Sequence, residues 1–545
     1  MLAFPYMVLQ AAAGQRLYSG ALFHPNDVFF YFSVLLQGNR GAWLFTNNFT
    51  FQQQPALPLH WFYLLLGKLD PWTGGPLADL ILWQFSRLLV GGLFLWQAWL
   101  LFGEALSRES RRVAFLFLLF SSGLAVYEVL LAPAAVRSSL PFDLAYSESS
   151  SFFELLYAPH FAAVLLLLVV FLREVRFALV DGSRSAALKA AAAAGFVSLI
   201  HPDKSTVLVI TLVLFTTWTS WRAGGSIPRW LLAGMMVAPA LPYPIYLLWL
   251  TRHSLPFQTF LAQDPFIPPG ALAYVLGYGI PGLCALTGLP RLWRAQAGPG
   301  EALLWSFVLA GIVLALLPLT MIPRKSVEGV QLAIAGLAGR QLVHDILPRL
   351  WRGGAFDRVA HLRPLGYSRR RLRLLSINLV LILSSPTVLA LAFASPRAGL
   401  ADSQELFLTR DDSAAVSWLQ HNADGGDVLL GGEETGQFAA AYGGTHVVFG
   451  HFQWTPQVGA EHLQLVHFLG QNRDGVCDPA TRSFDRVAYL RSRSVRWLYW
   501  GPRESRCNAL DPSSMNCLAL RFEHETTTIY AVEPQRLAAC VRGRS

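Results

Sequence analysis

Charged residues are scarce in this chain of 545 residues, at 14% of the total, against roughly 25% in an average soluble domain. Hydrophobic residues make up 53% and mean hydropathy is +0.40. Apolar runs of near-spanning length recur along most of the sequence. The low charge excludes an ordinary soluble protein, and the repeated runs predict a polytopic, multi-pass α-helical membrane protein.

Acidic residues are outnumbered, 34 against 43 lysines and arginines, which gives a net charge of +9. Such a balance can indicate nucleic acid as a partner. Here the basic residues fall mostly in short loops between apolar runs, as the positive-inside rule describes. We therefore expect membrane lipid, and no nucleic acid, as a partner.

Cysteine is also rare. Of five cysteines, Cys284 lies in an apolar run and reads as a small core residue. The other four lie in the polar C-terminal region: Cys477, Cys507, Cys517 and Cys540. Their spacing does not match a zinc site with paired CxxC motifs. They allow two disulfides, in any of three pairings, if the region faces an oxidising compartment.

The apolar runs predict about eleven membrane spans by length and hydropathy. The first, Met1 to Gly14, is short for a span and reads as a half-span or as the remainder of a longer first helix. The others cover residues 77–103, 113–132, 159–172, 186–200, 205–221, 230–250, 269–289, 302–321, 329–347 and 374–395.

Loop charges predict the orientation. With a cytoplasmic N-terminus, every second loop is rich in arginine, including Arg108 to Arg112 and the long run from Arg340 to Arg373. The alternate loops hold far fewer basic residues. This alternation places residues 15–76, residues 133–158 and the C-terminal region outside, in a bacterial inner or plasma membrane. The cysteines point to the same side independently.

The C-terminal region changes pattern. Asp411 and Asp412 precede an amphipathic run, as at the start of a capped helix, and Thr455 to Leu469 predicts another helix. Short apolar runs at 427–430, 446–449, 495–500 and 527–532 predict strands. We expect a membrane domain over residues 1–398 and an extracytoplasmic α/β domain over 399–545. Its Gly-Gly pairs are turns at strand ends, not a phosphate-binding GxGxxG.

The most informative stretch is Gln15 to Lys68, which is too polar to lie in lipid and too aromatic for an idle loop. His24-Pro25-Asn26-Asp27 predicts the start of a helix, with Asp27 near its positive end. Asp27 is either a candidate catalytic carboxylate or only a first-turn residue that satisfies backbone donors.

Other polar residues are predicted on the same outer face. Asp143 and Glu148 lie in the loop 133–158, and His160 and His201 lie at helix ends next to proline. A compact basic pair, Arg324 and Lys325, precedes Glu328 between two late spans. A carboxylate can deprotonate an acceptor hydroxyl or hold a divalent ion, and arginine matches phosphate oxygens. Alternatively, Asp143 and Glu148 are solvated acids, the histidines cap helices, and the basic pair anchors to lipid headgroups. Glu154 reads as structural.

The chain resembles the GT-C superfamily of polytopic glycosyltransferases, in particular its bacterial members. The resemblance spans nearly the whole chain and depends on the order of motifs that are individually weak. These are Asn26-Asp27, FYLLLGKL (Phe62 to Leu69), PFDLAYSESSSFFELLYAPH (Pro141 to His160), His201-Pro202, Ser417-Trp-Leu419, Gly450-His451 with Thr455, and Gly501-Pro-Arg-Glu504. An Asp-Glu pair found in the first loop of some such families is absent, because Val28 follows Asp27.

The resemblance implies transfer of a sugar from a polyprenyl-phosphate or polyprenyl-diphosphate carrier to an acceptor hydroxyl. It implies that Asp27 is catalytic or binds a metal, and it is compatible with a reaction with or without Mg²⁺ or Mn²⁺. We expect Asp27, Asp143 and Glu148 to be catalytic. The expected substrate-binding residues are His160, His201, Arg324, Lys325, Glu328 and His451.

Two other functions fit parts of the sequence. A transporter or flippase would place ionisable groups inside its spans, whereas the spans here hold almost none. A non-catalytic scaffold that displays the outer domain would not need Asp27 or Arg324.

Overall fold

The structure is a computed structural model that describes residues 1–70, 76–132, 140–222, 227–263, 269–317, 319–320, 322–352, 368–401, 406–533, 535–537 and 540. It divides into two compact units. Unit 1 comprises Met1–Pro5, Trp83–Leu247 and Phe266–Ser395, and unit 2 comprises Tyr6–Leu82, Leu248–Pro265 and Pro396–Ser545. Unit 2 thus combines the polar stretch after the first helix with the C-terminal region. The predicted boundary near residue 398 remains a prediction.

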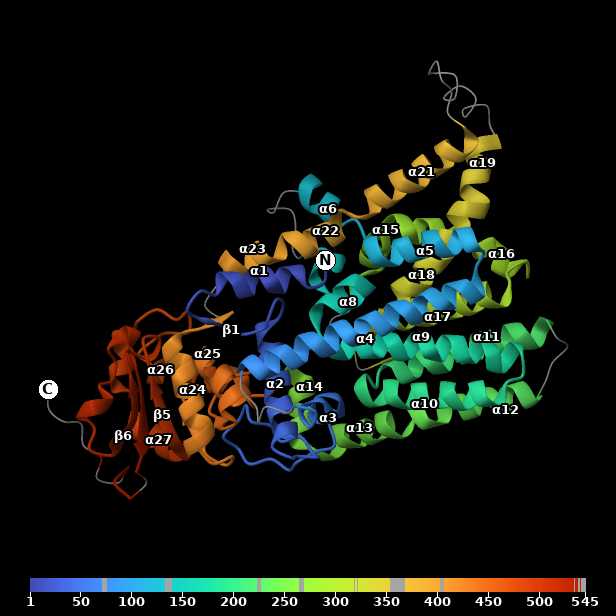
Figure 1. Cartoon of the computed structure of the whole chain (residues 1–545). Coiled ribbons are helices and arrows are strands. Elements are labelled where there is room, and N and C mark those ends of the chain that lie inside the picture. The colour runs from blue at the N-terminus through green and yellow to red at the C-terminus, as the bar shows by residue number, and fades with distance from the viewer. Residues whose placement is uncertain are drawn as a thin grey trace, which may run out of the picture. The chain divides into compact units, whose positions relative to one another are not determined.

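Unit 1 is helical (Figure 1). Its longer helices are α4 (Pro76–Ala105, which begins in unit 2), α5 (Arg108–Phe120), α9 (Pro159–Val180), α10 (Arg184–Ile200), α11 (Lys204–Arg222), α12 (Ile227–Val237), α15 (Ala271–Leu286), α17 (Pro299–Leu316), α18 (Val330–Gln341) and α21 (Arg369–Ser384). The shorter elements are α6 (Ala125–Leu131), α7 (Phe142–Ala145), η2 (Ser147–Ser149), α8 (Ser151–Tyr157), η3 (Ala238–Ala240), α13 (Pro242–His253, which ends in unit 2), α16 (Leu289–Trp293), η4 (Pro323–Val327), the π-helical turn η5 (Leu342–Ile346), α19 (Leu347–Arg352) and α22 (Pro386–Phe393).

Small residues allow the helices of unit 1 to pack closely. Helix α9 packs on α10, and α18 packs on α5, α15 and α17. A Cβ atom on Gly339 of α18 would lie 2.6 Å from the backbone nitrogen of Ala114 on α5, so only glycine allows this approach. The resulting core is apolar, with residues such as Phe102, Leu304 and Leu337 fully buried or nearly so.

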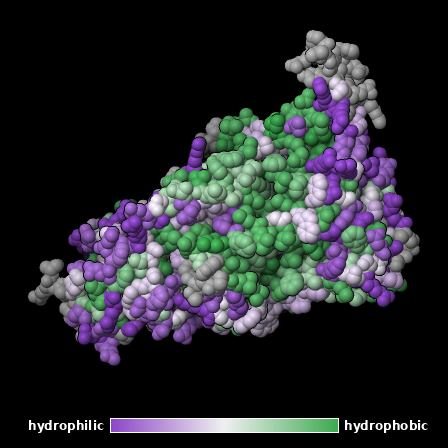
Figure 2. All heavy atoms as spheres, viewed as in Figure 1, coloured by the Kyte–Doolittle hydropathy of each residue, from purple (hydrophilic) through white to green (hydrophobic). Residues whose placement is uncertain are grey.

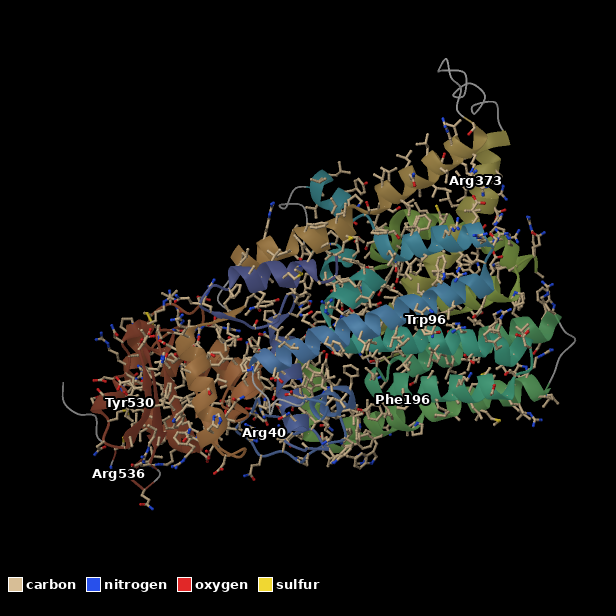
Figure 3. The ribbon with its side chains drawn as sticks, in the orientation of Figure 1. Arg40, Trp96, Phe196, Arg373, Tyr530 and Arg536 are labelled. Atoms are coloured by element: carbon tan, nitrogen blue, oxygen red, sulfur yellow. A yellow bond between two sulfur atoms is a disulfide. The ribbon has the colours of Figure 1, made fainter. Side chains whose placement is uncertain are left out.

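Large apolar side chains also cover the outside of unit 1. Trp96 on α4 and Phe196 on α10 are 56% and 58% exposed (Figure 3). Figure 2 shows apolar side chains gathered over the region of α4. In water such a surface would be unfavourable, and in a bilayer it is the expected lipid contact.

The predicted count of about eleven spans is confirmed only in part. Among the described residues, two helices are long and apolar enough to cross a membrane, α4 and α17, or up to five if each bent pair counts as one span. The bent pairs are α5 with α6 (51°), α12 and η3 with α13 (48°), and α21 with α22 (50°). Pro242 and Pro386 begin the second helix in two of these pairs, where proline removes a helical hydrogen bond.

Unit 2 contains a mixed five-stranded sheet in the order β4-β3-β5-β7-β6. The strands are β3 (Val428–Leu430), β4 (His446–Val447), β5 (Val495–Trp500), β6 (Leu518–His524) and β7 (Thr527–Val532). Strand β3 is parallel to β4 and β5, and β7 is antiparallel to β5 and β6. In β5, which is rich in aromatic residues, every residue is buried except Arg496.

The rest of unit 2 surrounds this sheet and the polar stretch. Its helices are α1 (Phe4–Ala12), α2 (Pro25–Asn39), α3 (Trp61–Gly67), α14 (Leu255–Gln263), α23 (Ser395–Ala401), α24 (Arg410–Asn422), α25 (Glu433–Phe438), the π-helical turn η6 (Ala439–Gly443), η7 (Pro479–Ser483), α26 (Val458–Phe468), α27 (Arg486–Ser492), η8 (Glu504–Cys507) and η9 (Pro512–Ser514). Strand β1 (Leu17–Tyr18) pairs with β2 (Phe407–Leu408) and ties the N-terminal stretch to the C-terminal region.

Local signals in the C-terminal region are confirmed. Helix α24 begins at a capping box in which Thr409 and Asp412 satisfy each other's backbone N–H groups. The four predicted strands and the helix predicted from Thr455 are present, and β6 is an additional edge strand. The cysteines that allowed three pairings form Cys477–Cys507 and Cys517–Cys540, and Cys284 is free.

Candidate functional site

Asp27 lies in the first turn of α2, as predicted. The helix begins at Pro25, whose fixed φ suits the first helical position, after His24 in the left-handed conformation at φ 47°. The Asp27 side chain is 35% exposed. The partial positive charge at the helix N-terminus favours its ionised form.

His451 faces this carboxylate. Its Nε2 lies 3.5 Å from Asp27 Oδ1, and the imidazole is only 1% exposed. The turn after β4 fixes the residue, because the His451 carbonyl accepts hydrogen bonds from the backbone N–H groups of Trp454 (3.1 Å) and Thr455 (2.8 Å). The sequence suggested both residues as candidates, but it did not pair them.

An aromatic cluster surrounds this pair within unit 2. The ring of Phe30, one turn after Asp27, stacks on Trp454 with centroids 4.9 Å apart and also meets the edge of His451 at 5.8 Å. Trp454 stacks on Phe260 of α14 at 4.5 Å. The Asn47 amide donates to the Trp454 carbonyl at 2.8 Å. The carboxylate therefore sits on a rigid, largely apolar support.

In unit 1, Glu148 and Arg324 form an ion pair. Arg324 Nη1 lies 2.8 Å from Glu148 Oε1, and the two side chains are 23% and 2% exposed. The guanidinium carbon also lies 5.1 Å from the centre of the Tyr146 ring. Burial raises the pKa of Glu148, and the charges of Arg324 and Lys325 lower it by more, so the net shift is downward. A predicted basic residue and a predicted acid thus neutralise each other.

Glu328 lies in a second, deeper network of unit 1. Its Oε2 is 2.7 Å from His201 Nδ1 and 3.7 Å from Lys204 Nζ, and Lys204 also donates to the Glu328 carbonyl at 2.8 Å. Glu154 Oε1 accepts the backbone N–H of Gly329 at 3.0 Å. Lys204, Glu154 and Glu328 are all 0% exposed. These contacts fix the chain directly after η4, the turn that carries Arg324 and Lys325.

Burial governs the ionisation of this network. It raises the pKa of Glu328 to about 7 against the opposing charge of Lys204. Burial and the like charge of Glu328 both raise the pKa of Glu154. Burial lowers the pKa of His201, and the nearby charges of Lys325 and Lys204 lower it further. The imidazole is therefore neutral at physiological pH.

Asp143 lies elsewhere in unit 1, whereas His160 borders the Glu328 network. Asp143 is 0% exposed, and its Oδ2 accepts the backbone N–H of Ala125 at 3.3 Å. Burial raises its pKa to about 6. The His160 ring packs against His201 with centroids 5.1 Å apart. Within unit 1 the structure therefore brings together His160, His201, Glu328 and, through η4, Arg324 with Glu148.

Lys204 was not among the site residues expected from the sequence. It lies three residues after His201, at the first residue of α11. Across the described residues, no three His, Cys, Asp or Glu side chains are grouped as a metal site.

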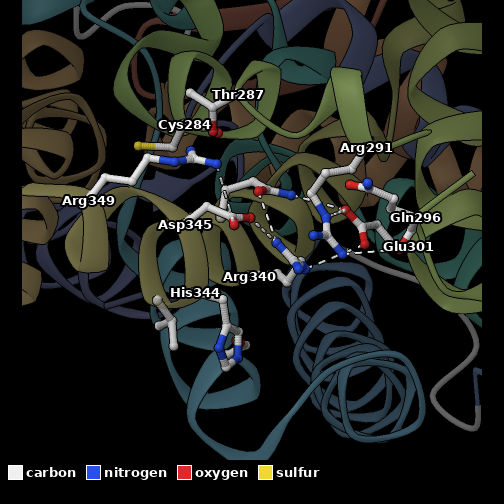
Figure 4. A network of polar contacts seen from close by, with 12 residues as sticks. Cys284, Thr287, Arg291, Gln296, Glu301, Arg340, His344, Asp345 and Arg349 are labelled. Atoms are coloured by element: carbon white, nitrogen blue, oxygen red, sulfur yellow. Dashed lines mark hydrogen bonds and ion pairs between the residues drawn. The ribbon is translucent and has the colours of Figure 1, made fainter. Parts of the chain in front are cut away.

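A further polar network of unit 1 lies around the π-helical turn η5 (Figure 4). Arg340 contacts Glu301 (3.4 Å) and Asp345, and Arg291 contacts Glu301 at 3.6 Å. These guanidinium groups are paired with carboxylates, and the network joins α16, α17 and α18. Its evident role is structural.

In comparisons with known proteins, no protein-family profile matches the sequence, and no curated protein matches it. Solved structures do resemble it. The oligosaccharyltransferase of Archaeoglobus fulgidus, tethered to an acceptor peptide, aligns with a TM-score of 0.49 and 12% identity over 97% of this chain and 74% of its own.

ArnT from Cupriavidus metallidurans, bound to undecaprenyl phosphate, aligns with a TM-score of 0.47 and 12% identity over 97% of this chain and 96% of its own. Both neighbours are GT-C glycosyltransferases, the superfamily that the sequence motifs resemble. Both TM-scores are below 0.5, so we transfer no fold, residue role or substrate from these structures.

Proposed function

We propose that the protein is a membrane glycosyltransferase that moves a sugar from a polyprenyl-phosphate or polyprenyl-diphosphate carrier to an acceptor hydroxyl. The reaction would take place on the extracytoplasmic face of a bacterial membrane. The observation that carries this proposal is the Asp27 carboxylate, which is partly exposed at a helix N-terminus and faces a buried imidazole. The carrier and the outer face follow from the motifs and loop charges of the sequence.

The proposed chemistry is an inverting displacement. Asp27 takes the proton of the acceptor hydroxyl while the hydroxyl oxygen attacks the anomeric carbon of the sugar. The bond from that carbon to the carrier phosphate oxygen breaks, and the phosphate leaves with the electron pair. A carboxylate suits this role when it is reachable, and the Asp27 side chain is 35% exposed in the first turn of α2, where the helix dipole favours negative charge.

In this proposal Arg324 and Lys325 hold the carrier phosphate. The Arg324 guanidinium is partly exposed, and the forked donors of a guanidinium match phosphate oxygens. Glu148 and Asp143 assist by balancing the charges around the carrier. His160, His201 and Glu328 are buried, so we assign them to supporting the substrate-binding turn η4 from behind.

The test compares glycolipids and surface glycans by mass spectrometry in cells that carry the wild type, no protein, or Asp27→Asn. We expect one glycosylated species to disappear both without the protein and in the Asp27→Asn strain. The control is Asp474→Asn, which changes an exposed carboxylate of the same unit and should leave the species intact. Full activity of Asp27→Asn, at equal protein levels, would contradict the assignment. Uptake of labelled substrate without transfer would favour a transporter instead.

A further inference from the structure

We propose that His451 is a positioning residue for Asp27: its imidazole donates Nε2–H toward Oδ1 and so holds the carboxylate in one orientation. This inference rests on the proposed function and assigns His451 a role other than substrate contact.

The hydrogen-bond partners determine which nitrogen carries the proton. The backbone N–H of Gln453 donates to His451 Nδ1 at 3.1 Å, so Nδ1 must present its lone pair. The ring proton is then on Nε2. That nitrogen is the one 3.5 Å from Asp27 Oδ1.

The ring has little freedom to turn away. Its plane stacks on Phe452 at 5.1 Å, and its edges meet Phe30 at 5.8 Å and Phe49 at 5.7 Å. The turn is tied to the N-terminal stretch because the Thr455 hydroxyl donates to the Phe49 carbonyl at 2.9 Å. The donor direction is therefore set by packing and by the backbone before any substrate binds.

Burial makes the contact between His451 Nε2 and Asp27 energetically important. The Nε2 atom is buried and has no closer hydrogen-bond partner among the described residues. An unsatisfied buried donor is costly, and the nearby carboxylate is the acceptor that can relieve the cost by a small adjustment.

The experiment uses the full-length protein in nanodiscs. The donor probe is whichever synthetic undecaprenyl-phosphate hexose or pentose the wild type cleaves fastest, and membrane lipid extract supplies the acceptor. His451→Phe keeps the ring volume among aromatic neighbours and removes the donor. His451→Gln places an amide N–H near the position of Nε2, whereas His451→Asn places its amide near Nδ1. His421→Phe, at an exposed histidine, is the control.

We expect His451→Phe to lower kcat by about 10- to 100-fold with KM for the donor within about twofold, the size of effect that misplacing a reacting group produces. The acid limb of its pH–rate profile should move to higher pH, because the ionised carboxylate has lost a donor. His451→Gln should recover most of the rate, and His451→Asn should not.

Wild-type kcat in His451→Phe, or equal rates in the Gln and Asn variants, would overturn the positioning role. The Gln and Asn pair decides the matter even if His451→Phe fails to fold. If Asp27→Asn is inactive while all His451 variants are active, this inference fails and the proposed function stands. If Asp27→Asn is itself active, the proposed function fails first.

Discussion

The candidate carboxylates of the two units lie in opposite environments. In unit 2, Asp27 is partly exposed, and its buried partner His451 donates Nε2–H in our assignment. In unit 1, Glu148, Glu154 and Glu328 are buried and lie among the cations Arg324, Lys325 and Lys204. A reachable carboxylate can accept a proton in a reaction. Buried carboxylates among cations fix the chain and set the local charge. The difference separates a candidate for chemistry from a candidate for support and phosphate binding.

The sharpest test of the supporting role is Lys204→Met. Removal of the ammonium leaves Glu154 and Glu328 buried without their common cation, and breaking a buried ion pair in this way costs about 3–5 kcal/mol. We expect a large fall in the thermal unfolding midpoint in detergent. Lys189→Met, at an exposed lysine on α10 of the same unit, is the matched control and should change the midpoint little. Equal midpoints for Lys204→Met and the wild type would remove the contrast between the units.

Arg324→Gln tests phosphate binding without a large change in stability. A charge-assisted hydrogen bond contributes about 1.5–3 kcal/mol, so we expect binding of undecaprenyl phosphate to weaken by roughly tenfold or more. Arg324 is 23% exposed whereas Lys204 is 0% exposed, so unfolding should change less than in Lys204→Met. Binding can be followed by native mass spectrometry in nanodiscs, with Arg397→Gln as a control. Unchanged affinity would leave Arg324 as a structural partner of Glu148 only.

Part of this contrast was predictable from the sequence. The start of α2 at Pro25, the capped helix α24 and strands such as β5 and β7 follow from local signals that act over a few residues. Strand β6 was missed because it is an edge strand that includes exposed charged residues, which obscure its alternation.

The pairings were not predictable. Asp27 and His451 lie at opposite ends of the sequence, and no local pattern reports which turn will face a helix terminus. Lys204 was not predicted as part of the network, because a sequence shows a charged residue but not whether its side chain is buried or paired. The same reason explains why Arg324 was identified as a basic candidate while its bond to Glu148 was not.

The smallest expected effect is the pH dependence of stability. The pKa of Glu328 is raised from its ordinary 4.5 to about 7, so the folded state holds this proton more tightly than the unfolded state. Stability should therefore fall as pH rises from about 4.5 to 7, with Asp143 adding the same trend up to about 6. Glu328→Gln should flatten this decline in thermal midpoints.

Glu148→Gln is the matched control with the opposite sign. The pKa of Glu148 is lowered, so its contribution is present at neutral pH and is lost as pH falls below its ordinary range. Glu148→Gln should therefore remove the loss of stability that the wild type shows at acid pH, and it should leave the rest of the pH profile unchanged. An unchanged profile in both variants would show that neither network titrates in this range.

The most direct test of the central claim is the release of undecaprenyl phosphate from a synthetic undecaprenyl-phosphate sugar by purified protein in nanodiscs. Membrane lipid extract is the acceptor source, and the wild type is compared with Asp27→Asn. General base catalysis typically contributes 10²- to 10⁴-fold, so we predict a loss of at least about 100-fold in release, with binding of the donor retained. Release by Asp27→Asn at the wild-type rate would contradict the account, because the carboxylate that faces His451 would then have no part in the reaction.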